Sequence, residues 1–323
     1  MTSEENTCYP LTFQPVYQDY IWGGQKLNSV FGRHLPAPLI AESWEITDRE
    51  DGMSVVDYGP AKGKSLHTLI QEMGSDLLGS HVHSEQFPLL IKILDANQVL
   101  SVQVHPNDQT ARTYGGEAKT EMWYVLEAEP GAKVYCGLEP DTHKSTFVQA
   151  IEKQTLEALL TEIPVKKGDA IFVPGGRVHA IAAGCLLLEV QQNSNTTYRL
   201  YDWGRVDATG KPRALHIDQS LQVIEWDDQD SALLNPHELE PGIEEITSCA
   251  YFCMQRIRLN EPRMFTNDGG SFHALFATDA DIQVNDTPLK KGRSVLMPAA
   301  LSDYLLNPCE EEAEVIRMFV PKP

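Results

Sequence analysis

The sequence predicts a mainly β protein made of two jelly-roll barrels in tandem, with a short helical insert. The first observation is a series of short runs rich in Val, Ile, Tyr and Phe, each six to nine residues long. Such runs suit strands and are short for helices. The second observation is frequent punctuation by turn residues, with 22 Gly and 20 Pro. The third is an internal repeat, which indicates a duplicated β unit.

The expected strands follow one another along most of the chain. They are 87–94, 99–105, 121–128, 169–174, 185–191, 251–259, 273–280 and 314–320. Many short strands separated by turns are typical of jelly rolls and barrels. Helical periodicity is confined to residues 145–160, where it forms two short pieces, to 64–79 and to 214–226. We expect these helices to cap the β core.

The repeat joins KKGDAIFVPGG at 166–176 to KKGRSVLMPAA at 290–300, about 124 residues apart. Both read Lys-Lys-Gly, five residues, then Pro. The acidic, Pro-containing stretch 227–245 has linker composition. We therefore predict an N-terminal catalytic domain at 1–230, with a short helical insert near 145–160, and a C-terminal β domain at 240–323. The alternative is a chance resemblance between two hairpins.

Composition restricts the partners. The formal net charge is −20 and the isoelectric point is near 4.8, which argues against nucleic acid and anionic membranes. The chain has no run of 18 apolar residues and no signal-peptide pattern at its start. Its six cysteines are dispersed, which favours reduced thiols in a cytoplasmic protein. An anionic small substrate would need a local cluster of Lys and Arg.

Four residues have the spacing of a metal site. Gln103 and His105 lie two apart on one strand, so they share a face. Glu121 begins the next expected strand. His179 is the last residue of a Gly-x5-Pro-x-Gly-x2-His pattern that begins at Gly168. Two imidazoles and a carboxylate are a common zinc set, to which the Gln103 oxygen adds a fourth donor. An open position would take water or substrate.

The repeat supplies an internal control for this site. His179 stands five residues after Pro174, whereas Asp303 stands five residues after Pro298. The second barrel lacks the paired ligands and the Glu, and its only candidate ligand is His273. We therefore expect one ion per chain, in the first barrel, and a metal-free second barrel.

These motifs resemble the two signatures of the cupin superfamily, with Gln103 replacing the first His. The resemblance then narrows. SVQVHPND, GGEAKTEMWYVL, VPGGRVHAI and NTTYRLYDWGR, together with QPVYQDYIWGGQKL and AESWEIT, resemble the class I mannose-6-phosphate isomerases in their short bacterial form. The resemblance runs from about residue 10 to the C-terminus.

This resemblance implies a zinc enzyme that interconverts mannose 6-phosphate and fructose 6-phosphate. It implies zinc ligands at Gln103, His105, Glu121 and His179, and substrate-binding residues at Ser101, Lys92, Lys119 and Arg199. It also implies a small sugar phosphate as partner, and leaves the oligomeric state open.

The residues themselves support the binding set. Lys92 interrupts the apolar run 87–94, and a buried Lys is costly unless it is paired. Lys119 is two residues before Glu121, so it points to the metal face. Arg199, with the two Lys residues, would form the cationic cluster that a phosphate requires. The alternatives are a Lys that reaches solvent from an edge strand and a stacked surface Arg.

Aldose–ketose isomerisation moves a proton between C1 and C2 through an enediolate. Glu189, flanked by apolar residues in a strand, could have the raised pKa of a general base. A solvated or salt-bridged Glu189 is the alternative, with Lys119, metal-bound His179 and a metal-bound water as rival bases. Arg199 either binds phosphate or assists at the reacting oxygens.

Two other functions fit parts of the pattern. Two His and one carboxylate also hold iron in cupin dioxygenases, although Gln103 and the cationic cluster argue against this. A non-catalytic sugar-phosphate sensor is the second alternative, but such a module needs no open Lewis acid.

Overall fold

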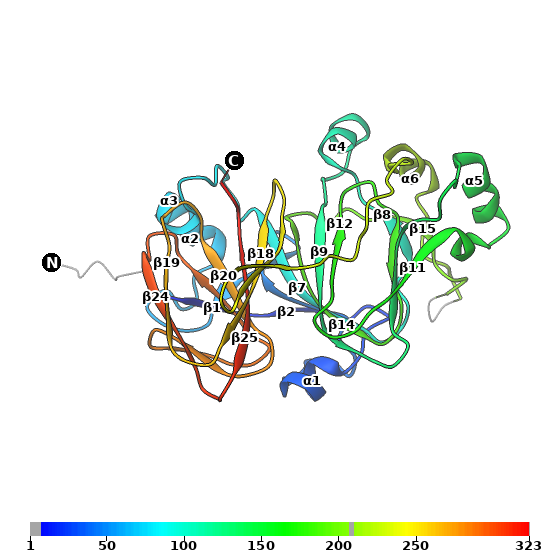
Figure 1. Ribbon diagram of the computed structural model, residues 1–323. Helices are drawn as coiled ribbons and strands as arrows, with labels where there is room; N and C mark the ends of the chain where they lie inside the picture. Colours follow the sequence, from blue (N-terminus) through cyan, green and yellow to red (C-terminus); the bar gives the residue numbers. More distant parts are fainter. Residues whose placement is uncertain (1–7, 207–209, 323) are drawn as a thin grey trace.

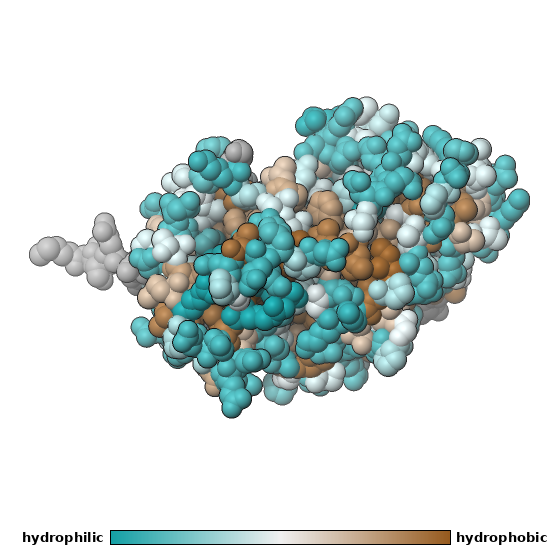
Figure 2. Space-filling model, in the orientation of Figure 1, coloured by the Kyte–Doolittle hydropathy of each residue, from teal (hydrophilic) through white to brown (hydrophobic). Residues whose placement is uncertain are grey.

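The computed structural model describes residues 8–206 and 210–322, and it has two β-rich halves side by side (Figure 1). The prediction of a mainly β protein is confirmed. Polar side chains cover most of the face in Figure 2, and an apolar band runs from the middle of the molecule across the N-terminal half. No helix in the described ranges is long and apolar enough to cross a membrane.

Two sheets pack together in the N-terminal half. The larger has, in order, β12 (Ala170–Val173), β9 (Glu121–Ala128), β14 (Cys185–Gln192), β7 (Leu89–Ala96), β3 (Glu42–Ile46) and β2 (Val16–Gln18). The smaller has β11 (Leu160–Pro164), β10 (Lys133–Leu138), β13 (His179–Ile181), β8 (Val102–Val104) and β15 (Tyr198–Tyr201). A separate hairpin joins β4 (Asp48–Arg49) to β5 (Gly52–Met53).

The C-terminal half has the same plan. Its larger sheet has β23 (Ser294–Met297), β20 (His273–Ala277), β25 (Ala313–Phe319), β18 (Cys253–Leu259), β17 (Ile243–Ser248) and β16 (His237–Glu240). Its smaller sheet has β22 (Thr287–Leu289), β21 (Ile282–Val284), β24 (Asp303–Pro308) and β19 (Arg263–Thr266).

The strand order is therefore repeated, and the sequence motif marks equivalent strands. β12 and β23 each begin after a glycine at positive φ, Gly168 (86°) and Gly292 (71°), the conformation in which a side chain is strained. β13 and β24 follow them in the two smaller sheets.

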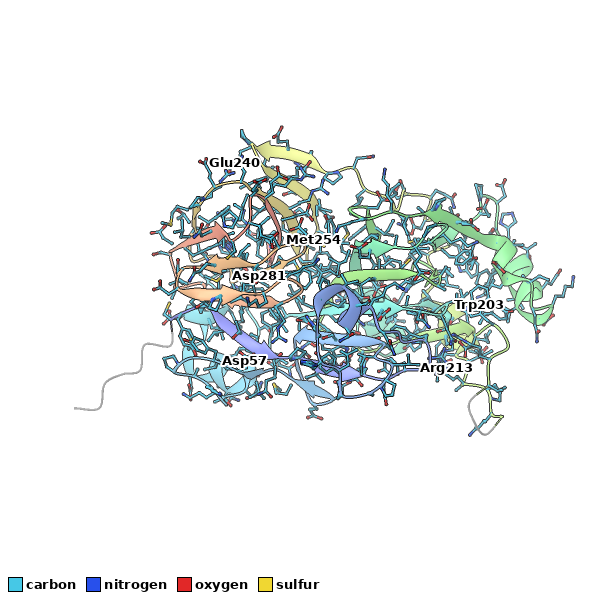
Figure 3. The ribbon with its side chains drawn as sticks, turned by 90° about the horizontal axis from the view of Figure 1, so that it is seen from below. Asp57, Trp203, Arg213, Glu240, Met254 and Asp281 are labelled. Atoms are coloured by element: carbon cyan, nitrogen blue, oxygen red, sulfur yellow. The ribbon has the colours of Figure 1, made fainter. Side chains whose placement is uncertain are left out.

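One N-terminal segment joins the C-terminal half. β1 (Leu11–Gln14) pairs with β23, and β6 (Val55–Val56) pairs with β1. Figure 3 shows Asp57 on the side of Asp281 and Glu240, while Trp203 and Arg213 lie at the opposite end. The predicted division near 230–240 stays a prediction, and these strands cross it. Residues 1–7, 207–209 and 323 of the predicted domains lie outside the described residues.

Short helices lie outside the sheets. The segments 64–79, 145–160 and 214–226 do contain helices, and two further helices were not predicted. The helices are α1 (Lys26–Phe31), α2 (Leu66–Met73), α3 (Ser75–Leu78), α4 (Asp108–Tyr114), α5 (Lys144–Glu152), the 3-10 turn η1 (Leu156–Leu159) and α6 (Ile217–Val223). α4 buries no residue and depends on a capping box at Asn107 and Thr110, which gives no apolar period to detect.

Candidate active site

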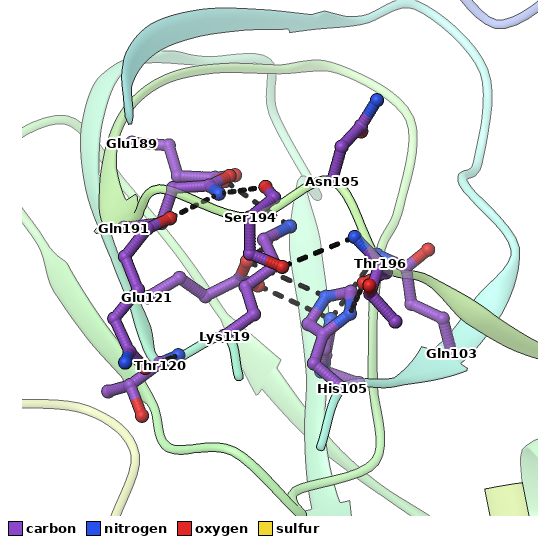
Figure 4. A network of polar contacts seen from close by, with 12 residues as sticks. Gln103, His105, Lys119, Thr120, Glu121, Glu189, Gln191, Ser194, Asn195 and Thr196 are labelled. Atoms are coloured by element: carbon purple, nitrogen blue, oxygen red, sulfur yellow. Dashed lines mark hydrogen bonds and ion pairs between the residues drawn. The ribbon is translucent and has the colours of Figure 1, made fainter. Parts of the chain in front are cut away.

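The strands of the N-terminal half bring the four predicted ligands together. The Cα atoms of His179 on β13 and Gln103 on β8 are paired, and Glu121 starts β9. His105 comes directly after the end of β8. The side chains of His105, Glu121 and His179 are buried, and Figure 4 shows Glu121 and His105 facing one another.

The donor atoms of these residues converge. His179 Nε2 lies 3.3 Å from one Glu121 carboxylate oxygen, and His105 Nε2 lies 3.6 Å from the other. The ligand atoms of His105, Glu121 and His179 all lie within 4.8 Å of one another. The Gln103 amide nitrogen lies 3.3 Å from His179 Nε2, and a half-turn of the amide exchanges its nitrogen for its oxygen.

The group fits a divalent cation. His105 Nε2 and both Glu121 oxygens are buried without a hydrogen-bond partner. The outer Nδ1 atoms of the imidazoles lie 2.8 Å from the Thr196 carbonyl and 2.9 Å from the Arg177 carbonyl. Each Nδ1 therefore donates to a carbonyl, which leaves an Nε2 lone pair directed inward. A cation would satisfy these orphaned atoms.

The two imidazoles of this site are uncharged at neutral pH. Burial lowers the pKa of His179 to about 4, and burial with Lys119 lowers the pKa of His105 well below its usual value. Burial raises the pKa of Glu121 to about 7, and Glu189 adds to that rise. Neutral imidazoles are the form that binds metal.

Two of the predicted metal ligands, Gln103 and Glu121, line a pocket of 230 Å³. The predicted binding residues Ser101, Lys92, Lys119 and Arg199 all line it, and so do Gln103, Glu121 and Glu189. The polar lining residues that were not predicted from the sequence are Tyr20, Glu42, Asn195, Thr197 and Arg213. The buried Trp22 also lines it.

Buried charges of alternating sign form one wall of this pocket. Lys92 Nζ lies 3.3 Å from both Glu42 and Glu189. Lys119 Nζ lies 3.6 Å from Glu189 and 2.9 Å from Glu121. Lys92 is 6% exposed, on a strand between β3 and β14, so it is not a Lys that reaches solvent from a sheet edge. The ion pairs are what allow these charges to be buried.

This chain of charges reverses the expected pKa of Glu189. Burial raises the pKa of Glu189, but Lys92 and Lys119 lower it by more than burial raises it, so the net shift is downward. The Trp123 indole also donates to Glu189, at 3.1 Å. The raised pKa predicted from apolar neighbours in sequence is therefore wrong, because Lys92 comes from the adjacent strand β7 and Lys119 from the residues just before β9. The salt-bridged alternative describes the observed surroundings.

The opposite wall is cationic. Arg199 donates from Nε to Ser101 Oγ at 3.3 Å and from Nη1 to the Ala214 carbonyl at 2.9 Å. Asp202 holds Arg213, with an Nε-to-Oδ2 distance of 2.8 Å. The three cations of the expected cluster, Lys92, Lys119 and Arg199, thus line one pocket, but both lysines are paired with carboxylates there.

The sequence contains a signal for one of these unpredicted lining residues, Glu42, and none for the loop residues. Glu42 alternates with the buried Trp44, whose indole donates to it at 2.7 Å, and this period of two could have placed Glu42 on an inward face. Arg213 lies in a loop, where sequence periodicity gives no direction. Asn195 and Thr197 belong to the segment after β14 and carry no such pattern either.

The fold and site define a class: a mainly β protein with a buried His/Glu/His group at the floor of a cationic pocket. The model of the type I phosphomannose isomerase catalytic domain matches residues 11–135. The mannose-6-phosphate isomerase ManA of Bacillus subtilis is 38% identical over 309 residues, 93% of this chain and 96% of its own. That of Streptococcus mutans is 46% identical over 67% of each chain.

Solved structures agree with these relatives. The crystal structure of the mannose 6-phosphate isomerase from Bacillus subtilis has a TM-score of 0.87 and 32% identity, and the match covers 96% of this chain and 99% of that one. The chain belongs to the type I mannose-6-phosphate isomerase family. A more distant isomerase determined with zinc and yttrium, 16% identical with a TM-score of 0.76, shares the fold.

Proposed function

We propose that this enzyme interconverts mannose 6-phosphate and fructose 6-phosphate with one zinc ion per chain. Zinc would be held by Gln103, His105, Glu121 and His179, as in the donor sets typical of this ion. The observation that carries the proposal is the junction of the buried His/Glu/His group with the cationic pocket. The relatives named for this reaction, and the zinc in one solved isomerase, support it.

The strand register supports an orientation for the substrate. The Cα atoms of Arg199 and Gln103 are paired and Arg199 Nε lies 3.3 Å from Ser101 Oγ, so we place the Arg199 side chain between the reacting oxygens and the Ser101 end of the pocket. Ser101 lies two residues before Gln103, about 6–7 Å along the strand, which is roughly the span from C2 to the phosphate of a hexose phosphate. Arg213, which Asp202 holds, lines the same pocket. We therefore assign the phosphate to Ser101 and Arg213.

The bound cation would supply a fixed positive charge that polarises the C1 and C2 oxygens. Lys119 and Arg199 stabilise the negative charge that develops on those oxygens during proton transfer. The contacts to the phosphate hold the sugar so that C1 and C2 stay in position.

We propose Glu189 as the base that moves the proton between C1 and C2. A pKa lowered by two lysines keeps its carboxylate ionised at neutral pH, so it can accept a proton, although with less driving force than a raised pKa would give. One of its oxygens, Oε1, has no hydrogen-bond partner and interacts only through ion pairs. Lys119 is the rival base, since it also lies against Glu189.

Substitution of Glu189 tests this assignment. Glu189→Gln should lower kcat by roughly 100-fold or more while the zinc content stays at the wild-type value. Glu162→Gln, an exposed position that pairs with Lys133, is the matched control and should keep full activity. Unchanged turnover in Glu189→Gln would remove Glu189 as the base and leave Lys119, His179 and a metal-bound water.

The reaction itself is tested by following mannose 6-phosphate conversion before chelation, after chelation and after zinc is added back. We expect activity to disappear on chelation and to return with zinc. Absence of activity in the zinc-loaded protein would rule out the isomerase. Oxygen consumption by an iron-loaded sample would instead favour the dioxygenase, and tight sugar-phosphate binding without turnover the sensor.

We also propose two finer points of organisation. The two halves are cupin-type jelly rolls in tandem, which the repeated strand order supports. The enzyme works in the cytoplasm, which the free thiols of Cys136, Cys185, Cys249, Cys253 and Cys309 support.

A further inference from the structure

The repeated strand order lets the pocket of the N-terminal half be mapped onto the C-terminal half. In the sequence motif, Val173 corresponds to Met297. Val173 pairs with Glu121 across β12 and β9, and Met297 pairs with His273 across β23 and β20. His273 therefore occupies the position of the metal-binding carboxylate.

The next strand continues the mapping. Trp123, two residues after Glu121, pairs with Glu189, and Leu275, two residues after His273, pairs with Arg317. Arg317 therefore occupies the position of Glu189. Across the following strand the partner of Glu189 is Lys92, and the partner of Arg317 is Gln255. The acid–base pair is thus replaced by a cation hydrogen-bonded to a neutral amide.

This position also holds a cavity, with a volume of 460 Å³. It is lined by Thr266, Asp268, Ser271, His273, Arg317 and Phe319, among others that include Lys322. Asp303, which takes the position of His179, is exposed and accepts a hydrogen bond from Thr266 at 3.1 Å. In the described part of the chain, no metal-binding group forms here.

Arg317 brings an unneutralised charge to this cavity. Its Nε and Nη2 both donate to the side-chain oxygen of Gln255, with the Nε bond at 2.9 Å. Its guanidinium also lies 5.3 Å from the Phe265 ring centre and 5.9 Å from that of Phe319. Among the described residues no carboxylate forms an ion pair with it. In a protein with a net charge of −20, an Arg left without an acid is notable.

The neighbours of Arg317 are mostly donors. The Tyr304 hydroxyl lies 2.8 Å from His273 Nδ1, and if it donates there the Nε2 of His273 carries the proton. Ser271 accepts from the Val320 amide at 3.0 Å, so its hydroxyl proton is available. Asp268 is the one acid in the lining, and the Gly270 amide donates to it at 2.8 Å.

We propose that this cavity of the C-terminal half binds a phosphate-bearing small molecule, held by Arg317 together with His273, Ser271 and Lys322. A guanidinium with further N–H and O–H donors around it suits a tetrahedral oxyanion. The Phe319 ring gives the cavity an apolar wall for an organic substituent. This site is separate from the catalytic pocket and does not depend on the proposed reaction.

Calorimetric titration of the zinc-loaded full chain tests this site, with inorganic phosphate and fructose 6-phosphate as probes. To remove the contribution of the catalytic pocket, the titrations are made in an Arg199→Gln, Arg213→Gln background. Arg317→Gln should weaken phosphate binding about tenfold or more, because a charge-assisted contact is lost. Arg258→Gln, an exposed position of the same half, is the matched control and should bind as its parent does.

The two probes distinguish the sources of the phosphate. Binding of fructose 6-phosphate at least ~10-fold more tightly than inorganic phosphate would assign the site to a sugar phosphate. Equal affinities would assign it to inorganic phosphate. If Arg317→Gln does not fold, Lys322→Gln, an exposed substitution near the chain end, should weaken binding several-fold. Affinities that are the same in both variants and their parent would overturn the proposal.

Isomerase assays keep this result separate from the proposed function. Arg317→Gln in the otherwise wild-type chain should convert mannose 6-phosphate normally when phosphate is absent. A chain without isomerase activity could still bind phosphate through Arg317, and an active isomerase could lack this site. Failure of one proposal therefore does not imply failure of the other.

Discussion

The two halves of the molecule have the same strand order, yet they bury very different polar groups. In the N-terminal half, β7 and β14 carry Lys92 and Glu189 facing one another inside the sheet. In the C-terminal half the paired positions on β18 and β25 carry Gln255 and Arg317. Buried apolar residues surround both pairs, so the backbone arrangement does not depend on which polar pair it contains.

The difference teaches where function resides in this fold. A buried ion pair costs desolvation free energy and seldom stabilises more than an apolar pair of the same size. The N-terminal half nevertheless buries a whole chain of charges from Glu42 to Glu121. Charges kept at such a cost are typical of a site that does chemistry, and the C-terminal half has only a simpler polar pair at the equivalent positions.

The largest contrast is expected at the equivalent positions His179 and Asp303. His179→Ala should lower zinc content and reduce kcat/KM by at least ~100-fold, because it removes a metal ligand. Asp303→Ala should leave both unchanged, since Asp303 is an exposed side chain. Metal analysis and initial rates measure both effects. Equal losses in the two variants would show that the halves share the catalytic work.

The next contrast concerns the stability of the two polar pairs. Lys92→Met leaves Glu42 and Glu189 buried without their shared cation, so the free energy of unfolding should fall by about 3 kcal/mol. Gln255→Met removes only a neutral acceptor from Arg317 and should cost about 1 kcal/mol. Urea unfolding of both variants provides the comparison. A smaller loss for Lys92→Met would mean that its carboxylates reach water or take up protons.

A smaller effect is expected at the seam between the halves. The hydroxyl of Tyr124 on β9 donates to Glu314 on β25 at 2.6 Å, which links one half to the other. Tyr124→Phe should lower the free energy of unfolding by about 1 kcal/mol, as the loss of a partly buried hydrogen bond does. Tyr114→Phe changes an exposed ring on α4 and should stay within about 0.5 kcal/mol of wild type. No loss in Tyr124→Phe would indicate that this hydrogen bond does not contribute to joining the halves.

The smallest effect is a pH dependence at Asp202. Burial raises the pKa of this carboxyl, but hydrogen bonds from Arg213 and Arg205 outweigh burial and the net shift is downward from 3.8. Its stabilising effect is therefore present above pH 3.8 and is lost as the pH falls below that value.

Asp202→Asn tests this dependence by comparison with wild type. The wild type should be more stable at pH 6 by up to ~1 kcal/mol, because the two Arg partners are partly exposed. The difference should shrink at pH 3, because the carboxyl of the unfolded chain takes up a proton below pH 3.8 and the stabilising effect is lost as the pH falls towards the lowered pKa of the folded state. A difference that is the same at both pH values would show that the charge of Asp202 does not contribute.

The sequence was informative wherever a local pattern exists. All the expected strand segments contain strands, because short apolar runs between turn residues have one common solution. The ligand positions Gln103, His105, Glu121 and His179 also come together, since each stands at a fixed place on a strand or a turn. Periodicity predicted the helices of 64–79, 145–160 and 214–226 but not α4, whose polar residues are held by its cap.

Features that depend on distant segments could not be predicted in this way. The apolar neighbours of Glu189 in sequence suggested a raised pKa, whereas Lys92 approaches from the adjacent strand and lowers it. Arg213 reaches the pocket through Asp202, a contact made between two loops. Residues 11–14 have no local signal for pairing with a strand near residue 296.

That last pairing has a consequence for how the chain folds as it is made. Leu11 pairs with Leu296, so β1 has to wait for its partner until residue 296 has left the ribosome. β6 pairs with Phe13 and Gln14, but until β23 is made the Leu11–Thr12 end of β1 is an open strand edge that could associate with other chains. Contacts this far apart in sequence also slow folding. Separating the two halves into independent proteins would leave the C-terminal sheet with an open edge at β23.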